Sequence, residues 1–314
     1  MDYYLNTTIA YHTEKLNTLG WELTVCNSLQ PENTPLRKIL FNNQSYGNLL
    51  YEFLSQFIPL KEIKKVIEIG GGYGYLMKDF LDRNSFEACM VDISNALLEK
   101  QKETLRSHTV SFRNEDFLET EPDFLKKFDL AILNENLGDF PTLVNLNCEL
   151  FNSDFKTGDP DLIETRRLFK SYILKKPESD KFNFNLGALK IIEKLCASGI
   201  PYIFCGEHSC EAAVPDNIPF PIYMESKGIP EKISLMGHDE YTIKLSYLQK
   251  VAEAFGYSCR RGPFADYIPF ELTDKLIYIM KLKGSQSDEA ELICQFIEDL
   301  YKYEYLLLIR KQPS

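Results

Sequence analysis

Short apolar runs alternate with longer amphipathic segments from about residue 60 to the end of the chain. The apolar runs that predict strands are residues 65–69, 88–91, 110–112, 129–134, 202–205 and 305–309. The segments with apolar residues at helical spacing are 76–81, 95–106, 186–196 and 245–255. Ser94 is placed to cap the second of these helices, and Gly199 and Gly256 follow the last two. Strands that alternate with helices predict a mostly parallel α/β sheet with helical crossovers.

Three segments interrupt this alternation and divide the chain into a predicted cap and a main domain. Residues 1–60 read as mostly helical and precede the first strand, so we expect a helical N-terminal cap followed by one domain over 61–314. Residues 151–184 and 207–240 are long excursions within that domain. Such excursions commonly form the substrate side of an α/β enzyme or a lid, and surface decoration without function is the alternative.

The composition is that of a globular protein with an excess of acidic residues. Of the 314 residues, 44% are hydrophobic and 26% are charged. The 46 acidic residues outnumber the 35 basic ones and give a formal net charge of −11. Nucleic acids and anionic membranes attract positively charged surfaces, so we expect neither as a partner. The chain has no apolar run of the roughly 18 residues that a spanning helix needs, and we expect no secretory signal in its first residues.

The cysteines and histidines give no clear metal motif. The eight cysteines are sparse and form no CxxC pair, which favours a reducing, cytoplasmic compartment over a disulfide scaffold or zinc ribbon. His208 lies between Cys205 and Cys210, but Cys205 falls within a predicted strand, so we expect no metal site. Glu207 and His208 follow a central strand and are candidates for lining a substrate pocket. The remaining histidines are expected to be structural or exposed: His12, His108 and His238.

A glycine-rich turn follows the first predicted strand and carries the strongest chemical signal. Glu68, Gly70, Gly72 and Gly74 form the pattern E-x-G-x-G-x-G, in which glycines allow a tight turn and a close approach to a ligand. The dinucleotide fingerprint G-x-G-x-x-G fails because Tyr75 stands at its last position. A carboxylate inside the strand end suits a cationic ligand better than a pyrophosphate. S-adenosylmethionine (SAM), with its sulfonium and amino groups, is such a ligand.

Acidic residues also follow the next three strands, at the edge where open α/β sheets bind ligands. Asp92, followed by Ile93, offers two carboxylate oxygens to two ribose hydroxyls. Asp116 can accept a hydrogen bond from an adenine amino group while Phe117 covers the ring. A helix cap for Asp92 and an ordinary turn for Asp116 are the alternatives. The fourth strand ends at Asn134, a further expected cofactor contact, and is followed by two acidic residues: Glu135 and Asp139.

This arrangement resembles the class I SAM-dependent methyltransferases, and within them the MidA-like family. The resemblance rests on four segments: EIGGGYGYLMKDFL, VDISNALLEKQKETL, NENLGDFP and GHDEYTIKLSYLQKVAEAFGY. It implies a Rossmann-like, mostly parallel seven-stranded sheet and SAM as the cofactor. The family contains protein arginine methyltransferases that serve assembly of respiratory complex I. Two features depart from it: Gly206-Glu207-His208 replaces the family's D-Y-G, and the N-terminal region is shortened.

The expected reaction is transfer of the SAM methyl group to an acceptor nucleophile by in-line displacement. Glu135 and Asp139 are expected to face the acceptor, where two carboxylates could hold the guanidinium of a protein arginine. The alternative is that Glu135 binds the SAM amino group while Asp139 caps a helix. A small-molecule O- or N-methyltransferase and a catalytically silent SAM-binding assembly factor are the other functions consistent with the sequence. The acceptor and the oligomeric state stay open.

Overall fold

A seven-stranded sheet forms the centre of the chain in the computed structural model, which describes residues 3–14, 24–151, 157–224 and 226–311. The strands, in their order across the sheet, are β11 (Tyr257–Pro263), β12 (Tyr303–Arg310), β8 (Tyr202–His208), β5 (Leu130–Asn134), β2 (Lys65–Ile69), β3 (Glu87–Asp92) and β4 (Val110–Asn114). The five strands from β8 to β4 are parallel, and β12 runs antiparallel to both of its neighbours. The mostly parallel seven-stranded sheet predicted from the sequence is therefore confirmed. Every predicted strand forms, and β11 is an additional one.

The central strands are mostly apolar because both faces of the sheet are covered. Successive side chains point to opposite faces, so Val66 belongs to one hydrophobic core and its neighbour Ile67 to the other. Ile132 and Leu133 on β5 divide between the two cores in the same way. All four side chains are fully buried. Because both faces of these strands are buried, we look for the polar side chains of a site at the strand ends.

The predicted crossover helices also form. They are α4 (Tyr75–Arg83), α5 (Asn95–Thr104), α8 (Leu186–Ser198) and α9 (Leu245–Ala254). The Oγ of Ser94 accepts a hydrogen bond from the N–H of Leu97, which caps α5 as expected. Gly199 ends α8 with a φ of +79°, a left-handed conformation that glycine adopts without strain. A short helix, α6 (Pro122–Leu125), lies between β4 and β5.

The N-terminal region mixes helices with one strand. Its helices are α1 (Ile9–Glu14), α2 (Val25–Ser28), η1 (Arg37–Ile39) and α3 (Tyr46–Leu54). Before them, β1 (Tyr4–Asn6) pairs with β6 (Thr142–Asn147), which also pairs with β7 (Lys181–Phe184). The sequence did not predict this second sheet, because a three-residue strand joined to a segment far along the chain leaves no local periodicity. The division into a cap and a main domain stays a prediction.

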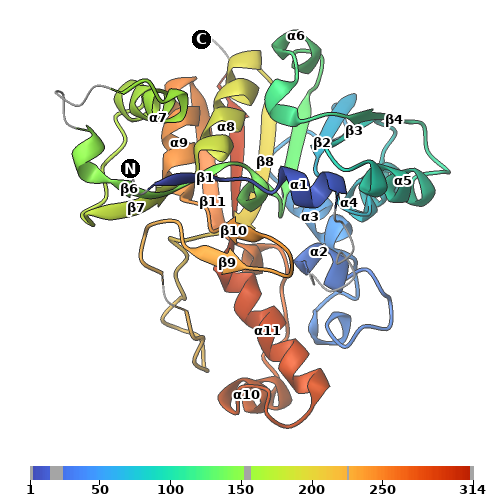
Figure 1. Cartoon of the computed structure of the whole chain (residues 1–314). Helices are drawn as coiled ribbons and strands as arrows, with labels where there is room; N and C mark the ends of the chain where they lie inside the picture. The colour runs from blue at the N-terminus through green and yellow to red at the C-terminus, as the bar shows by residue number, and fades with distance from the viewer. Residues whose placement is uncertain (1–2, 15–23, 152–156, 225, 312–314) are drawn as a thin grey trace.

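The two predicted insertions form elements outside the central sheet. The first contains α7 (Pro160–Ser171) and β7, and it includes residues 152–156, which lie outside the described residues. The second contains β9 (Lys232–Ser234), which pairs with β10 (Asp239–Tyr241). Figure 1 shows the β9–β10 hairpin beside α1, and the Nδ2 of Asn6 donates a hydrogen bond of 2.9 Å to the carbonyl of Asp239.

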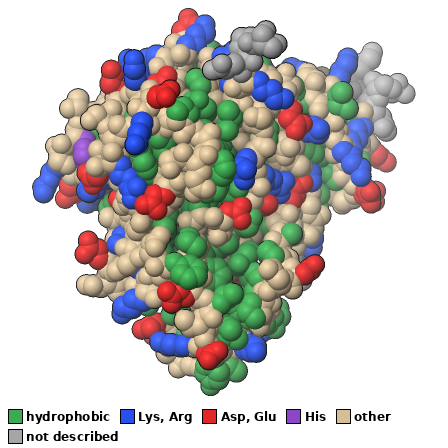
Figure 2. All heavy atoms as spheres, turned by 180° about the vertical axis from the view of Figure 1, so that it is seen from behind, with side chains coloured by type: hydrophobic (Ala, Val, Ile, Leu, Met, Phe, Trp, Pro, Cys, Tyr) green, Lys and Arg blue, Asp and Glu red, His purple; other side chains and the backbone are tan. Residues whose placement is uncertain are grey.

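The C-terminal part adds two helices that the sequence analysis did not identify. They are α10 (Asp274–Lys281) and α11 (Asp288–Lys302), drawn at the lower end of the molecule in Figure 1. Seen from behind in Figure 2, hydrophobic side chains gather over the middle and lower part of the surface. Leu272 and Tyr278 are among the exposed large hydrophobic residues. The remaining short helical turns are η2 (Phe117–Glu119), η3 (Leu137–Asp139), η4 (Cys148–Phe151) and η5 (Phe264–Asp266).

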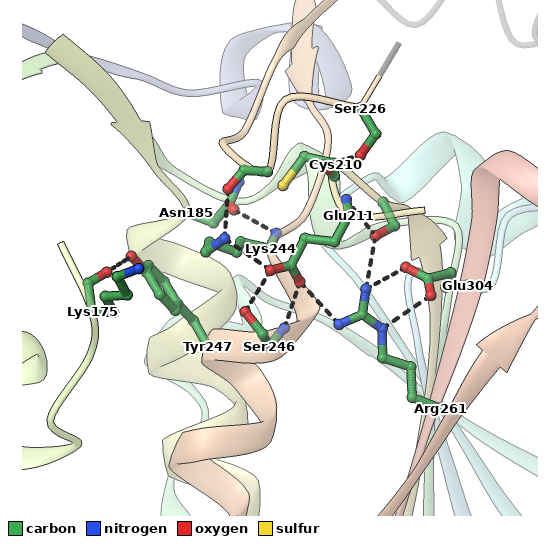
Figure 3. A network of polar contacts seen from close by, with 12 residues as sticks. Lys175, Asn185, Cys210, Glu211, Ser226, Lys244, Ser246, Tyr247, Arg261 and Glu304 are labelled. Atoms are coloured by element: carbon green, nitrogen blue, oxygen red, sulfur yellow. Dashed lines mark hydrogen bonds and ion pairs between the residues drawn. The ribbon is translucent and has the colours of Figure 1, made fainter. Parts of the chain in front are cut away.

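A network of ion pairs joins the second insertion to the sheet (Figure 3). Glu211 accepts from the Nζ of Lys244 at 2.8 Å and from the guanidinium of Arg261 at 2.9 Å. Its carboxylate also accepts from the N–H and the hydroxyl of Ser246, at the start of α9. Arg261 on β11 reaches Glu304 on β12 at 2.5 Å. The network therefore ties the segment after β8 to the edge strand β11, its neighbour β12 and one helix.

The cysteines of the chain are all free thiols, as the sequence predicted. All eight lie within the described residues. None of the helices in the described ranges is both long and apolar enough to cross a bilayer. The cytoplasmic location stays a prediction.

Candidate functional site

A cavity of about 580 Å³ opens at the carboxyl ends of the central parallel strands. Every site residue predicted from the sequence lines it, with the exception of Gly74: Glu68, Gly70, Gly72, Asp92, Ile93, Asp116, Phe117, Asn134, Glu135 and Asp139. Further lining residues come from α1, α2, the β9–β10 hairpin, the end of β8 and the α11–β12 junction. The fold thus brings the four predicted strand-end motifs together at one site.

The glycine turn after β2 shapes one wall of this cavity. Gly72 has a φ of +52°, and a Cβ at this position would meet nothing within 4 Å, so its Cα faces open space. Gly70, with a φ of +61°, packs against the side chain of Asn136. Gly74 has a φ of +80° and starts α4, which explains why it shapes the turn without lining the cavity. The turn therefore presents bare backbone to whatever occupies the cavity.

Glu68 is a buried carboxyl group whose charge is not compensated. Its side chain is 2% exposed, and within the described part of the chain its Oε2 has no hydrogen-bond partner. Burial and the nearby Asp92 carboxylate raise the pKa of Glu68 to about 8. A cationic donor bound in the cavity would satisfy this oxygen and favour its ionised form.

Asp92 is held in position by two hydrogen bonds. Its Oδ1 accepts from the N–H of Ser94 and its Oδ2 from the Nε2 of Gln101, both at 2.9 Å. The Nε2 of Gln101 also donates to the carbonyl of Gly72 at 3.0 Å. Burial raises the pKa of Asp92 to about 6. Gln101 was not among the predicted site residues, yet it joins two of them.

The third motif combines a turn with an aromatic surface. The Oδ1 of Asp116 accepts from the N–H of Leu118 at 2.9 Å, so Asp116 caps η2. Phe117 is buried and lines the cavity. The carbonyl of Ile93 accepts from the Nδ2 of Asn114 at 2.9 Å, which connects the ends of β3 and β4. Asp116 therefore caps the turn and lines the cavity at the same time.

The carboxylate of Glu135 accepts hydrogen bonds from the N-terminal region. Its Oε2 accepts from the N–H of Val25 at 2.7 Å and its Oε1 from the N–H of Cys26 at 3.0 Å. Burial raises the pKa of Glu135 to about 7. Its φ of +54° is unusual for a residue with a side chain and marks a strained backbone after β5. Asn134 beside it accepts a hydrogen bond from the hydroxyl of Tyr46.

Asp139 belongs to a cluster of polar side chains that the sequence did not predict. Its Oδ1 lies 2.8 Å from the Nε2 of His12 and 3.8 Å from the Nε2 of His238. The same Nε2 of His238 lies 2.8 Å from the Oε1 of Glu240. The expectation that His12 and His238 have structural or exposed positions missed this convergence, because residues so far apart in the sequence share no local pattern.

Glu207 and His208 both line the cavity at the end of β8. The carboxylate of Glu207 accepts from the N–H groups of Gly138 at 3.1 Å and His208 at 2.7 Å. Burial raises the pKa of Glu207 to about 8, and burial together with Lys302 lowers that of His208 to about 4. Asp299 on α11 also reaches the cavity, and burial raises its pKa to about 6.

The charge of the cavity distinguishes between ligand classes. Carboxyl groups on β2, β3, β8 and α11 and in the segments after β4 and β5 line it. No lysine or arginine is among the described residues that line it. Crowded and partly desolvated carboxyl groups favour a ligand that carries positive charge. A pyrophosphate would meet carboxyl groups without a lysine or arginine to pair with it. The cavity is therefore suited to a cation such as a sulfonium or an ammonium group.

Comparison with known proteins supports the assignment of the fold. A family model described as a methyltransferase domain matches residues 66–149. The chain is similar to the structure of a COG1565 superfamily member from Burkholderia thailandensis bound to S-adenosyl-homocysteine, with 15% identity, 92% of this chain and 79% of that one covered, and a TM-score of 0.55. It is also similar to the native structure of an uncharacterized COG1565 superfamily protein from the same organism, with 15% identity, coverage of 88% and 80%, and a TM-score of 0.54. No curated protein matches. The chain has the Rossmann-like fold of class I methyltransferases.

Proposed function

We propose that this chain is a SAM-dependent methyltransferase. The observation that carries the proposal is the buried Glu68, whose Oε2 is unsatisfied among the described residues, in a cavity lined by carboxyl groups and by neither lysine nor arginine. SAM carries a sulfonium and an amino group, so it supplies the positive charge that this cavity lacks. The methyltransferase domain matched over residues 66–149 and the S-adenosyl-homocysteine bound by the Burkholderia thailandensis protein support the same cofactor.

The contacts predicted at the ends of β2, β3 and β4 keep their roles in this proposal, with the exception of Gly74, which does not line the cavity. Glu68 and the bare backbone at Gly72 receive the methionine part of SAM. Asp92 offers its remaining lone pairs to the ribose hydroxyls, and Gln101 keeps its carboxylate oriented. Asp116 and Phe117 flank the adenine. These three strand ends would hold an extended ligand along the carboxyl edge of the sheet.

Bound SAM supplies an electrophilic methyl group, and the chain holds the two reactants in the geometry for transfer. Methyl transfer by in-line displacement needs the acceptor nucleophile opposite the sulfonium, and holding two reactants in that geometry removes much of the barrier. Phe140 and Pro141 follow β5 and line the cavity, and Met236 in the β9–β10 turn lines it from another element. These apolar side chains limit the access of water to the reacting atoms.

The contacts of Glu135 favour a small-molecule acceptor over a protein arginine. A guanidinium held between Glu135 and Asp139 would need free carboxylate oxygens on both residues. Both oxygens of Glu135 already accept backbone N–H groups of α2, and Asp139 faces His12. We therefore propose a small molecule with an oxygen or nitrogen nucleophile as the acceptor, and methylation of a protein arginine becomes an outcome of the test.

Incubation of the purified chain with cell extract and SAM labelled in its methyl group tests the proposal. We expect label to enter the small-molecule fraction. Label in protein, identified by mass spectrometry as methylarginine, would restore the arginine assignment. Calorimetric binding of S-adenosylhomocysteine with no transfer to any fraction would instead identify a catalytically silent SAM-binding protein. Absence of binding would reject the proposal itself.

A further inference from the structure

Four side chains with metal-ligating atoms meet at one rim of the cavity. The Oδ1 of Asp139 lies 2.8 Å from the Nε2 of His12 and 3.8 Å from the Nε2 of His238. The ligand atoms of these three residues all lie within 4.8 Å of one another. The Oε1 of Glu240 adds a fourth atom, 2.8 Å from the Nε2 of His238. Two ligands of one metal ion, each about 2.1 Å from it, are about 3.0–3.5 Å apart, so these separations are close to those of a shared ion.

Contacts outside the cluster hold its members in place. The hydroxyl of Thr8 donates to the carbonyl of Asp139 at 2.9 Å, which fixes the start of α1 against η3. The ring of Tyr11 stacks on that of His238, with centroids 3.9 Å apart and planes inclined by 23°. Three segments that are distant in the sequence are therefore joined by contacts that do not involve the ligand atoms, and the donor set is preorganised.

We propose that His12, Asp139 and His238 bind a divalent transition-metal ion, with Glu240 as a fourth ligand. Imidazole nitrogens combined with carboxylate oxygens suit first-row ions such as Zn²⁺, Mn²⁺ or Fe²⁺, whereas Mg²⁺ and Ca²⁺ prefer oxygen ligands alone. His12, Asp139 and Glu240 all line the cavity, so the ion would be accessible from it. The cofactor assignment uses none of these four residues, and Asp139 is the one among them that the sequence predicts at the acceptor.

The metal site goes beyond the proposed methyl transfer and stands on its own geometry. Its place in the rim has one consequence that does rest on the proposed function. An ion there would coordinate an oxygen of the acceptor and stabilise its deprotonated form, since a Lewis acid lowers the pKa of a bound hydroxyl group. This consequence favours an oxygen nucleophile among the small-molecule acceptors proposed above.

Titration of the metal-free full-length chain with Co²⁺ tests the site directly. We expect one Co²⁺ per chain, with visible absorption typical of nitrogen and oxygen ligands and without a sulfur-to-cobalt charge-transfer band. The absence of that band separates this cluster from the free cysteines, of which Cys26 also lines the cavity. Calorimetry with Zn²⁺ should give the same stoichiometry. Because no SAM is present, failure of metal binding and failure of cofactor binding are read separately.

Variants on two different elements locate the ion. Asp139→Asn and His238→Gln should each weaken Co²⁺ binding at least tenfold, with circular dichroism showing whether each variant folds. His108→Ala is the matched control, because His108 pairs with Asp82 away from the cavity, and it should bind as the wild type does. Wild-type protein that binds neither Co²⁺ nor Zn²⁺ would overturn the proposal whatever the variants do. Undiminished binding in both folded variants, or a charge-transfer band, would overturn it equally.

Discussion

Gln101 donates a hydrogen bond of 2.9 Å from its Nε2 to the carboxylate of Asp92. The same nitrogen reaches the carbonyl of Gly72, so one side chain of α5 orients both the second strand end and the glycine turn. Both partners line the cavity. This shared donor makes the ribose contact and the methionine contact of the proposed SAM site parts of one rigid unit.

Replacement of Asp92 should weaken cofactor binding without unfolding the chain. Asp92→Ala leaves two ribose hydroxyls without their acceptor in a buried site, which costs about 1–3 kcal/mol, or roughly fivefold to 150-fold in affinity. Calorimetry with S-adenosylhomocysteine measures the change. Glu87→Ala, at the other end of the same strand, serves as the matched control and should bind normally. Equal affinity in both variants would mean that Asp92 does not contact the ribose.

Gln101→Ala should produce a smaller loss of the same kind. The variant removes the donor that orients Asp92 and Gly72 but leaves both groups present, so we expect a loss of about 1 kcal/mol, or roughly fivefold in affinity. In a double-mutant cycle with Asp92→Ala, the two losses should be less than additive because they act through one carboxylate. Full additivity would show that Gln101 acts independently of Asp92.

The affinity for SAM should rise with pH. Burial and Asp92 raise the pKa of Glu68 to about 8, so the carboxyl group of the free protein is largely protonated at neutral pH. A cation binds better to the carboxylate, so binding below the raised pKa must release a proton, and affinity should increase up to about tenfold per pH unit until it levels off near pH 8. Glu68→Gln should bind more weakly and lose most of this dependence between pH 6 and 9. An identical pH profile in that variant would assign the dependence to another group.

Glu135 should matter for the order of the N-terminal region. Its two oxygens accept the N–H groups of Val25 and Cys26, so Glu135→Ala leaves the start of α2 without these partners. Hydrogen exchange at the two amides should accelerate by roughly tenfold or more, in keeping with the loss of hydrogen bonds to a carboxylate. Exchange rates on α5, which contains neither amide, provide the internal reference. Unchanged protection at Val25 and Cys26 would contradict this role.

The network of Figure 3 should contribute to stability in a pH-dependent way. Burial alone would raise the pKa of Glu211, but hydrogen bonds from Lys244 and Ser246 hold it below its usual range. Its contribution is therefore present above the ordinary glutamate pKa and is lost as pH falls through the lowered value. Glu211→Ala leaves Lys244 and Arg261 without their shared partner and should cost about 3 kcal/mol at pH 7. Denaturant unfolding at pH 7 and pH 3 should show this difference shrinking in acid.

The sequence predicted the parts of the site that follow from local pattern. Apolar runs locate the strands, and parallel strands bring their carboxyl ends to one edge, so the positions of Glu68, Asp92 and Asp116 could be inferred without a structure. The pairing of β1 with β6 and the approach of the β9–β10 hairpin to α1 depend on contacts between distant segments. Neither periodicity nor spacing encodes such contacts, which is why His12 and His238 were not predicted to meet.

The roles of individual acidic residues could not be predicted from the sequence either. The sequence places Glu135 after a central strand, but only the fold shows that the N–H groups of α2 occupy its carboxylate. The contribution of α11 to the cavity, through Asp299, was missed because an amphipathic helix near the C-terminus gives no sign of the site it covers.

Calorimetric titration with S-adenosylhomocysteine, using the wild type and Gly72→Val, tests the SAM site most directly. Gly72 has a φ of +52° and faces open space in the cavity, so a valine side chain would fill the space that the ligand needs. Thermal unfolding of the variant without ligand shows whether the strained backbone still folds. We expect one site per wild-type chain with a dissociation constant in the low micromolar range or below, about 8 kcal/mol or more of binding free energy, and no measurable binding in the variant. Absence of heat with the wild type, or undiminished binding in the folded variant, would contradict the proposed SAM site.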